Sequence, residues 1–251
     1  MTGRVSLIGH RGQPLSYPEN SIEGFEHCLK QGIHYLETDV HITADGVPVL
    51  SHDANLLKLS GRQVFVAEHD FSTIGSLAAG YPERFGEQFN HCRIASLARF
   101  SELLSAWPDV QCFIELKEGA IGHFRNRAID LTIEAIEPIR NQCIFISFEY
   151  DALVYARQHF DLPIGWVLPE WSDESRDKAI ELAPEYLHVD VDICPRQQSE
   201  LWDGPWRWVA YTINSAEQVK TLSGLGVELL ETDRYSDLIK ESDLIEVSND
   251  F

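Results

Sequence analysis

Residues 112–148 read CFIELKEGAIGHFRNRAIDLTIEAIEPIRNQCIFISF, in which two apolar runs flank a segment with helical periodicity. The runs Cys112–Leu116 and Cys143–Phe148 have the length and the composition of buried strands. Between them, apolar residues recur at helical spacing from Ala128 to Ile136. A strand, a helix and a second strand in this order form the unit from which parallel sheets are built. We therefore expect an α/β protein.

The same alternation continues along the rest of the chain. Further apolar runs of strand length are Val5–Ile8, Tyr35–Ile42, Val47–Leu50, Ile164–Leu168, Tyr186–Val191, Trp208–Ile213 and Val227–Leu230. Segments with helical spacing separate them, as at Ile22, Phe25, Cys28 and Leu29. The chain has 251 residues, and this many strand–helix units over that length fit a closed barrel better than a doubly wound open sheet. The pattern predicts a TIM-type (β/α)8 barrel.

One segment, at about residues 54–96, interrupts the alternation. It contains short polar and glycine-containing pieces, such as Gly80-Tyr81-Pro82, and shows little periodicity. We expect it to be a small insertion after the second strand. Because the chain has no internal repeat and no linker rich in Pro, Gly or Ser, we expect residues 1–251 to form one domain.

The charge balance limits the kinds of partner. Lys and Arg number 20 against 40 Asp and Glu, which gives a formal net charge of −20. Nucleic acid is not an expected partner, because binding it depends on Lys and Arg displacing counterions from the phosphate backbone. An acidic protein that acts on an anionic small molecule needs local positive charge, which a bound divalent cation would supply.

The cysteines and the apolar runs indicate in which compartment of the cell the protein is expected. The five cysteines are widely spread and include no Cys-x-x-Cys pair, so neither a disulfide framework nor a zinc site is expected. The start Met1–Gly9 lacks the features of a secretory signal, and no stretch approaches 18 consecutive apolar residues. We expect a cytoplasmic protein without stable membrane association. The sequence makes no prediction of oligomeric state.

Ionisable residues gather at the carboxyl ends of the expected strands, where barrel enzymes build their active sites. The first strand is followed by Gly9-His10-Arg11-Gly12. His10 can exchange a proton near neutral pH, and Arg11 offers a rigid fork for phosphate oxygens. A histidine with only a structural hydrogen bond is the alternative for this position.

The second strand ends in Glu37-Thr38-Asp39. Residues two apart in a strand share a face, so both carboxylates point the same way. Inside a barrel, two such charges repel each other and lose hydration unless something neutralises them. A divalent cation would do so, and oxygen ligands favour Mg²⁺ or Ca²⁺ over zinc. The alternative, two solvated carboxylates on an edge strand, fits poorly with the apolar residues that flank them.

Two later stretches could complete a site. Asp45-Gly46 predicts a turn between two apolar runs, and a short hairpin there would return His52 to the carboxylates. The next barrel strand ends in Glu115-Leu116-Lys117, which places a third carboxylate and a cation on one face. A simple ion pair is the alternative for these two residues.

These motifs together resemble the signature of the glycerophosphodiester phosphodiesterases. The motifs that carry the resemblance are His10-Arg11-Gly12, Pro18-Glu19-Asn20-Ser21, Glu37-Thr38-Asp39-Val40, Asp45-Gly46, His52-Asp53, Glu115-Leu116-Lys117, Ser147-Phe148, Tyr211-Thr212-Ile213-Asn214, Gly226-Val227 and Thr232-Asp233. They occur in order and extend the resemblance over the chain from Leu7 to Asp233.

The resemblance implies an α/β barrel with an insertion after its second strand. It also implies metal-dependent hydrolysis of glycerophosphodiesters, such as glycerophosphocholine or glycerophosphoethanolamine, to glycerol 3-phosphate and an alcohol. By motif, Glu37, Asp39 and Glu115 would hold one divalent cation, Mg²⁺ or Ca²⁺. His10 and His52 would form the acid–base pair, a role that suits imidazole because its pKa lies near the working pH.

The resemblance also implies a phosphate grip by Arg11 and Lys117, which would oppose the charge that builds on phosphate oxygens during attack. Tyr211 would offer an aromatic face to glycerol or to a choline-like cation, although an aromatic residue on a barrel strand is more often part of the core. The chain departs from the family pattern at Glu231 and Tyr235, where an apolar residue and a proline are usual. Neither departure is expected to touch the proposed metal ligands or histidines.

Two rival functions use the same residues. A lysophospholipase D-type activity would keep the site and change the substrate. The lack of a basic amphipathic helix argues against it, whereas the chain's several tryptophans keep it open. A non-catalytic phosphate-binding barrel is the second rival, because a fold alone does not establish activity. The full set of histidines, carboxylates and cations argues against that reading.

Overall fold

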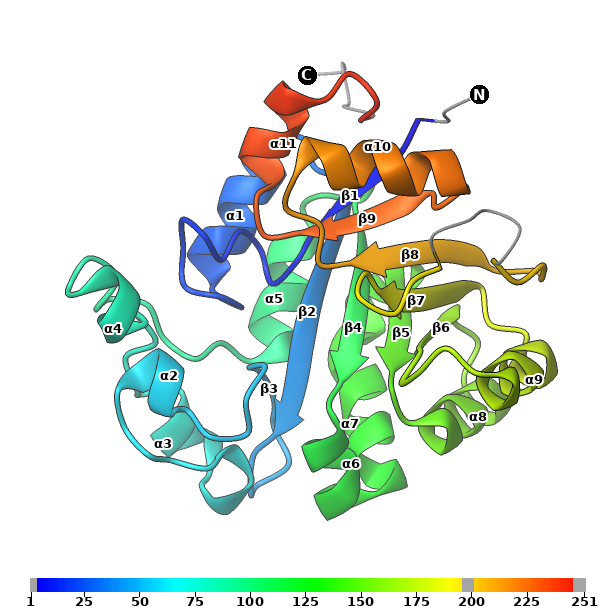
Figure 1. Cartoon of the computed structure of the whole chain (residues 1–251). Coiled ribbons are helices and arrows are strands. Elements are labelled where there is room, and N and C mark those ends of the chain that lie inside the picture. Colours follow the sequence, from blue (N-terminus) through cyan, green and yellow to red (C-terminus); the bar gives the residue numbers. More distant parts are fainter. Residues whose placement is uncertain (1–3, 196–200, 246–251) are drawn as a thin grey trace.

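Eight parallel strands close into a ring in the computed structural model of this protein, which describes residues 4–195 and 201–245 (Figure 1). The ring consists of β1 (Ser6–Gly9), β2 (Tyr35–Ile42), β4 (Gln111–Leu116), β5 (Cys143–Ser147), β6 (Ile164–Val167), β7 (Tyr186–Asp190), β8 (Arg207–Tyr211) and β9 (Leu229–Thr232). Pairing of β1 with both β2 and β9 closes it. The predicted (β/α)8 barrel is confirmed.

A ninth strand lies outside the ring. β3 (Pro48–Leu50) pairs antiparallel with β2, with Val40 opposite Leu50. The turn between them passes through Gly46, whose φ of 85° is a conformation that glycine adopts at little cost. The predicted hairpin is therefore present, and it returns the chain along β2 to Asp39, whose backbone oxygen accepts a hydrogen bond from the N–H of Ser51.

Helices cover the outside of the ring and connect its strands (Figure 1). They are α1 (Ile22–Lys30), α5 (Leu97–Leu104), α6 (Glu118–Phe124), α7 (Asn126–Ile136), η2 (Glu137–Gln142), α8 (Tyr150–His159), α9 (Asp173–Leu182), α10 (Ala216–Leu225) and α11 (Tyr235–Glu241). Serine side chains cap several helix starts, as Ser21 does by accepting a hydrogen bond from the backbone N–H of Gly24. This cap fixes the entry of the chain into α1 directly after the first loop of the barrel.

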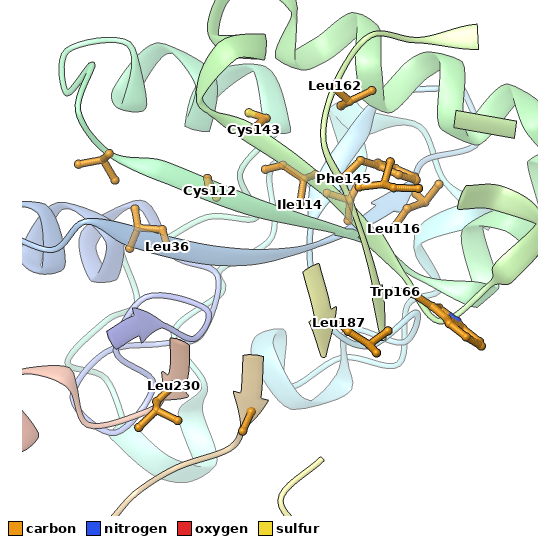
Figure 2. Close-up of a cluster of buried hydrophobic side chains, with 14 of the residues drawn as sticks. Leu36, Cys112, Ile114, Leu116, Cys143, Phe145, Leu162, Trp166, Leu187 and Leu230 are labelled. Carbon is orange, nitrogen blue, oxygen red and sulfur yellow. The ribbon is translucent and has the colours of Figure 1, made fainter. Parts of the chain in front are cut away.

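The core has two layers because strand residues alternate between the two faces of the ring. Outward-facing residues such as Leu36, Cys112, Ile114 and Leu116 pack under the helices (Figure 2). Inward-facing residues form a separate cluster that includes Phe113. Since Glu115 follows Phe113 by two residues, its side chain also points into the ring. The alternation that builds the core therefore also turns the acidic residues inward.

The predicted insertion lies between β3 and α5. It contains α2 (Leu57–Ser60), η1 (Val66–Glu68), α3 (Phe71–Ile74) and α4 (Pro82–Phe85), which gather on one side of the barrel in Figure 1. These short helices enclose their own apolar cluster, which includes Leu56, Leu59 and Ile74. This local cluster holds the segment together despite its weak periodicity in the sequence.

Tryptophans cover the barrel where β7 leads to β8. The described residues of this connection, 191–195 and 201–206, form turns and loops. The rings of Trp171 and Trp202 stack with centroids 4.1 Å apart, and the ring of Trp208 lies 5.5 Å from that of Trp171. These indoles pack against the outer layer of the core.

Within the described residues, no helix combines the length and the apolar character needed to cross a membrane. The cytoplasmic location stays a prediction.

Candidate active site

A cavity of about 90 Å³ opens at the carboxyl ends of the ring strands. Six of the eight predicted site residues line it, namely His10, Arg11, His52, Glu115, Lys117 and Tyr211. The other two, Glu37 and Asp39, lie buried beside it on β2 and contact Arg11. The structure therefore brings all eight predicted residues together.

Three carboxylates form the acidic part of this site. Glu37, Asp39 and Glu115 are at most 9% exposed, and each offers an oxygen within 4.8 Å of the others. The Oε1 atom of Glu37 is buried and has no hydrogen-bond partner among the described residues. A buried carboxylate oxygen without a partner is costly, and a hard cation with oxygen ligands would satisfy it. The donor set fits Mg²⁺ or Ca²⁺.

Burial changes the acidity of these carboxyl groups. It raises the pKa of Glu115 to about 6, although the ammonium of Lys117 opposes the shift. Burial also raises the pKa of Glu37, and repulsion from Asp39 adds to the increase. Burial would raise the pKa of Asp39 as well, but Arg11 and Lys117 hold it well below its ordinary value.

Two cations offset the carboxylates. The Nε atom of Arg11 lies 3.0 Å from an oxygen of Asp39. The Nζ atom of Lys117 lies 2.6 Å from Glu115 and 3.2 Å from Asp39. The predicted ion pair of Glu115 and Lys117 is thus present, and it lies inside the larger cluster rather than apart from it. Both cations border the cavity, where an anionic group would meet them.

Each predicted histidine is held by a carboxylate. The Nδ1 atom of His10 lies 2.7 Å from Asp233, and the Nδ1 atom of His52 lies 2.8 Å from Asp53. A carboxylate can only accept, so the hydrogen of a neutral imidazole sits on Nδ1 in both rings. The Nε2 atom of each ring is then left to exchange a proton with a molecule in the cavity. Burial lowers the pKa of His52.

An asparagine from the first loop fixes Asp39. The Nδ2 group of Asn20 donates to Asp39 at 2.9 Å, while its Oδ1 atom accepts from the hydroxyl of Thr38 and from the backbone N–H of Asp39. The φ of Asn20 is 57°, a left-handed conformation that asparagine adopts more readily than most residues. In the sequence, Asn20 stands out only as part of the motif Pro18-Glu19-Asn20-Ser21, which predicts no role for it.

The insertion contributes one cation to the site. The Nζ atom of Lys58, in α2, lies 2.6 Å from the buried carboxylate of Glu19. Arg11 approaches the same carboxylate oxygen at 3.8 Å. Lys58 therefore neutralises Glu19, which would otherwise attract Arg11 away from the cavity. Sequence reasoning missed this contact because 39 residues separate Lys58 from Glu19.

The expectation that Glu231 stands apart from the proposed catalytic residues is wrong. Its Oε1 atom lies 3.7 Å from the Nε2 atom of His10, and its Oε2 atom lies 3.9 Å from His188. In the β1–β9 pairing Glu231 is opposite Ile8, an inward-facing residue, so its side chain also enters the ring. Tyr235 is buried in the outer layer of the core, away from the cavity.

A second and larger cavity adjoins the first. This outer groove, of about 900 Å³, lies between the insertion and the start of α6. His52 and Lys117 line both cavities, so they mark the boundary where the two meet.

Comparisons with known proteins agree with this geometry. The model of the Glycerophosphoryl diester phosphodiesterase family matches residues 10–236. The chain is 28% identical to a glycerophosphodiester phosphodiesterase of Caldanaerobacter subterraneus, over 94% of this chain and 97% of that protein. It is 25% identical to one of Bacillus altitudinis, over 91% of this chain and 94% of that protein.

Solved structures show the same fold. A phosphodiesterase of Oleispira antarctica, solved in complex with the product sn-glycerol-3-phosphate, superposes with a TM-score of 0.86 at 23% identity and covers 94% of this chain and 96% of its own. A structure from Silicibacter pomeroyi superposes with a TM-score of 0.82 at 25% identity and covers 96% of this chain and 93% of its own.

Proposed function

Because the chain belongs to the glycerophosphoryl diester phosphodiesterase family and is thus a phosphodiesterase, we propose that it hydrolyses glycerophosphodiesters to glycerol 3-phosphate and an alcohol. We propose glycerophosphocholine and glycerophosphoethanolamine as substrates and one Mg²⁺ or Ca²⁺ ion as cofactor. One observation carries the proposal: two histidines, each held by a carboxylate at Nδ1, border a small cavity beside three buried acidic residues. We further propose that residues 1–251 work as one domain.

Glu37, Asp39 and Glu115 would hold the cation. Support comes from their all-oxygen donor set and from the buried Oε1 atom of Glu37, which lacks a protein partner among the described residues. When bound, the cation would stabilise the negative charge that builds on the phosphate oxygens. Its charge would also favour the ionised forms of Glu37 and Glu115, whose pKa values burial, and to a lesser degree repulsion from Asp39, raise.

Arg11 and Lys117 would bind the phosphate. Both side chains border the cavity, and both keep a positive charge because the neighbouring carboxylates raise their pKa values further than burial lowers them. The planar guanidinium of Arg11 can pair with two phosphate oxygens at once. Tyr211, at the end of β8, also lines the cavity and would contact the glycerol portion.

His10 and His52 would perform the two proton transfers of the reaction. One ring would accept a proton from the attacking oxygen, and the other would supply a proton to the departing alcohol. Asp233 and Asp53 would keep the Nε2 atom of each ring available for this task. Asn214 supports Asp233, because its Nδ2 group donates to that carboxylate at 3.2 Å.

The direct test is release of glycerol 3-phosphate from glycerophosphocholine and glycerophosphoethanolamine. Purified protein would be assayed with added Mg²⁺ or Ca²⁺ and with a chelator. We expect activity that the chelator removes and that His10→Ala abolishes. His91→Ala serves as the matched control, because the side chain of His91 is 65% exposed and lies outside both cavities. A folded wild-type protein that releases no glycerol 3-phosphate with either metal would contradict the proposal.

A further inference from the structure

We propose that the outer groove binds the alcohol portion of the diester and selects an alcohol that carries a positive charge. The inference rests on the proposed hydrolysis and adds a binding site to it. The groove is bordered by the insertion on one side and by the start of α6 on the other. The residues on which the argument depends are His52, Leu57, Phe65, Glu83, Lys117 and Glu118.

The two cavities divide the substrate between them. The inner cavity, of about 90 Å³, is small and lies among the catalytic candidates, whereas the outer groove measures about 900 Å³. His52 and Lys117 line both spaces, so a phosphate held at Lys117 has one ester arm on each side. The glycerol arm suits the inner cavity, where hydroxyl groups can meet His188 and Glu231. The alcohol arm then extends into the groove.

Basic and acidic side chains both line the groove, and one of the acidic residues, Asp53, already pairs with His52 at 2.8 Å. Lys117 and His52 stand at the inner end, beside the phosphate position. The other lysine of the groove, Lys58, already pairs with Glu19 at 2.6 Å. The exposed Glu83 of the insertion lines the groove and has no ion-pair partner among the described residues. Glu118, at the start of α6, is likewise exposed, lines the groove and has no ion-pair partner among the described residues.

This charge arrangement matches a diester with a cationic alcohol. The negative phosphate would meet Lys117, and an ammonium group a few atoms away would meet Glu83 and Glu118. Phe65 also lines the groove and is 39% exposed, so its ring is accessible from the groove. An aromatic face attracts an ammonium group, most strongly when the group carries methyls and is weakly hydrated. An alcohol with a carboxylate or a phosphate would be repelled.

The experiment compares diesters that share the glycerol phosphate half. The kcat/KM values would be measured for glycerophosphocholine, glycerophosphoethanolamine, glycerophosphoglycerol and glycerophosphoserine. We expect the first two to exceed the neutral glycerophosphoglycerol by about tenfold, and also to exceed glycerophosphoserine, whose carboxylate offsets its ammonium group. Equal values for all four diesters would overturn the proposal while leaving the hydrolysis intact. Absence of hydrolysis of all four would instead contradict the proposed function.

A charge reversal tests the residues. In the double variant Glu83→Lys and Glu118→Lys, we expect the ratio of kcat/KM for glycerophosphocholine over glycerophosphoglycerol to fall about tenfold, mainly through KM. Glu87→Lys is the control, because Glu87 is exposed on the same insertion but does not line the groove. A ratio unchanged in the double variant, or changed equally by Glu87→Lys, would overturn the assignment.

A third experiment tests whether the groove binds an acyl chain instead of the alcohol. Lysophosphatidylcholine differs from glycerophosphocholine by an acyl chain on the glycerol half. Faster hydrolysis of this lipid than of glycerophosphocholine would mean that the groove accepts the acyl chain instead of the alcohol. We expect the lipid to be hydrolysed at least about tenfold more slowly, since the inner cavity of about 90 Å³ cannot hold an acyl chain.

Discussion

The Nδ1 atom of His10 lies 2.7 Å from a carboxylate oxygen of Asp233, although 223 residues separate the two in the sequence. Closure of the ring causes this contact, because β1 ends at Gly9 directly beside the end of β9 at Thr232. His10 follows the first of these strands and Asp233 follows the second. Asp233 therefore sets the orientation and the tautomer of a proposed catalytic ring without facing the reaction itself.

Asp233→Asn is expected to lower kcat at least about 100-fold with little change in KM, because the amide no longer favours the hydrogen on Nδ1 of His10. Initial rates with glycerophosphocholine would measure both constants. The exposed Asp243 provides the matched change Asp243→Asn, which should leave both constants within about twofold. A kcat within about threefold of wild type in Asp233→Asn would show that the contact does not orient the ring.

Lys58→Ala is expected to reduce the free energy of unfolding by about 1–3 kcal/mol, because it leaves the buried carboxylate of Glu19 without its 2.6 Å partner. The KM for the diester should also rise, since Glu19 would then compete with the phosphate for Arg11. Chemical denaturation and initial rates would measure the two effects.

Lys30→Ala is the control for this change. The ion pair of Lys30 and Glu26 has a similar distance, 2.9 Å, but its side chains are 66% and 40% exposed. Removing it should change the free energy of unfolding by less than about 0.5 kcal/mol. Equal losses in the two variants would contradict a special role for the buried carboxylate.

The contribution of Glu115 to the stability of the metal-free protein should fall as the pH rises from about 4.5 to about 6. The pKa of Glu115 is raised from 4.5 to about 6 in the folded protein. Within that window the unfolded chain has lost the proton and the folded protein still holds it, so raising the pH favours unfolding. The loss from Glu115 alone is about 2 kcal/mol and is complete above about pH 6. The difference between wild type and Glu115→Gln in thermal denaturation, in chelator at several pH values, would measure it. The comparison is needed because histidines with lowered pKa values, such as His52, gain stability over the same pH range in both proteins.

Mg²⁺ or Ca²⁺ should counter this loss, because either ion favours the ionised carboxylates. The rise in melting temperature on adding the ion should therefore be larger at pH 7 than at pH 5. Glu115→Gln should reduce both the pH dependence in chelator and the rise caused by the ion. An equal rise in wild type and in this variant would place the ion elsewhere.

Gly12→Ala is expected to destabilise the protein by about 1–3 kcal/mol and to lower activity. Gly12 has a φ of 83°, and a Cβ there would lie 3.0 Å from the backbone carbon of Gly24. Gly122→Ala is the contrast, because a Cβ at that position in α6 meets nothing within 4 Å. That change should stabilise by up to about 1 kcal/mol, as expected for alanine in a helix. The same sign for both variants in thermal denaturation would contradict the argument.

Much of the fold could be predicted because its signals are local. The alternation of Cys112–Leu116 with the helical spacing before Cys143 gives a parallel sheet from the residues alone. The spacing of Glu37 and Asp39 likewise predicts two carboxylates on one face, which the structure shows inside the ring. The family implied by the motifs is confirmed as well.

The supporting contacts could not be predicted in this way. Asp233, Glu231 and Lys58 reach the site only because the ring closes and the insertion folds back onto the first loop. No local periodicity encodes such distances. Glu231 is the clearest example. The sequence marks it as a departure from the family pattern, but only the closed ring brings it within 3.7 Å of His10.

The stacked indoles of Trp171 and Trp202 give the barrel an optical reporter on the β7–β8 side. Rings 4.1 Å apart couple electronically, so the near-ultraviolet circular dichroism of the protein should contain a band that depends on this pair. The band would report the packing of this side of the barrel independently of the cavity at the carboxyl ends of the strands. Loss of the band before the loss of activity during gentle heating would reveal that the wall opposite the insertion loosens first.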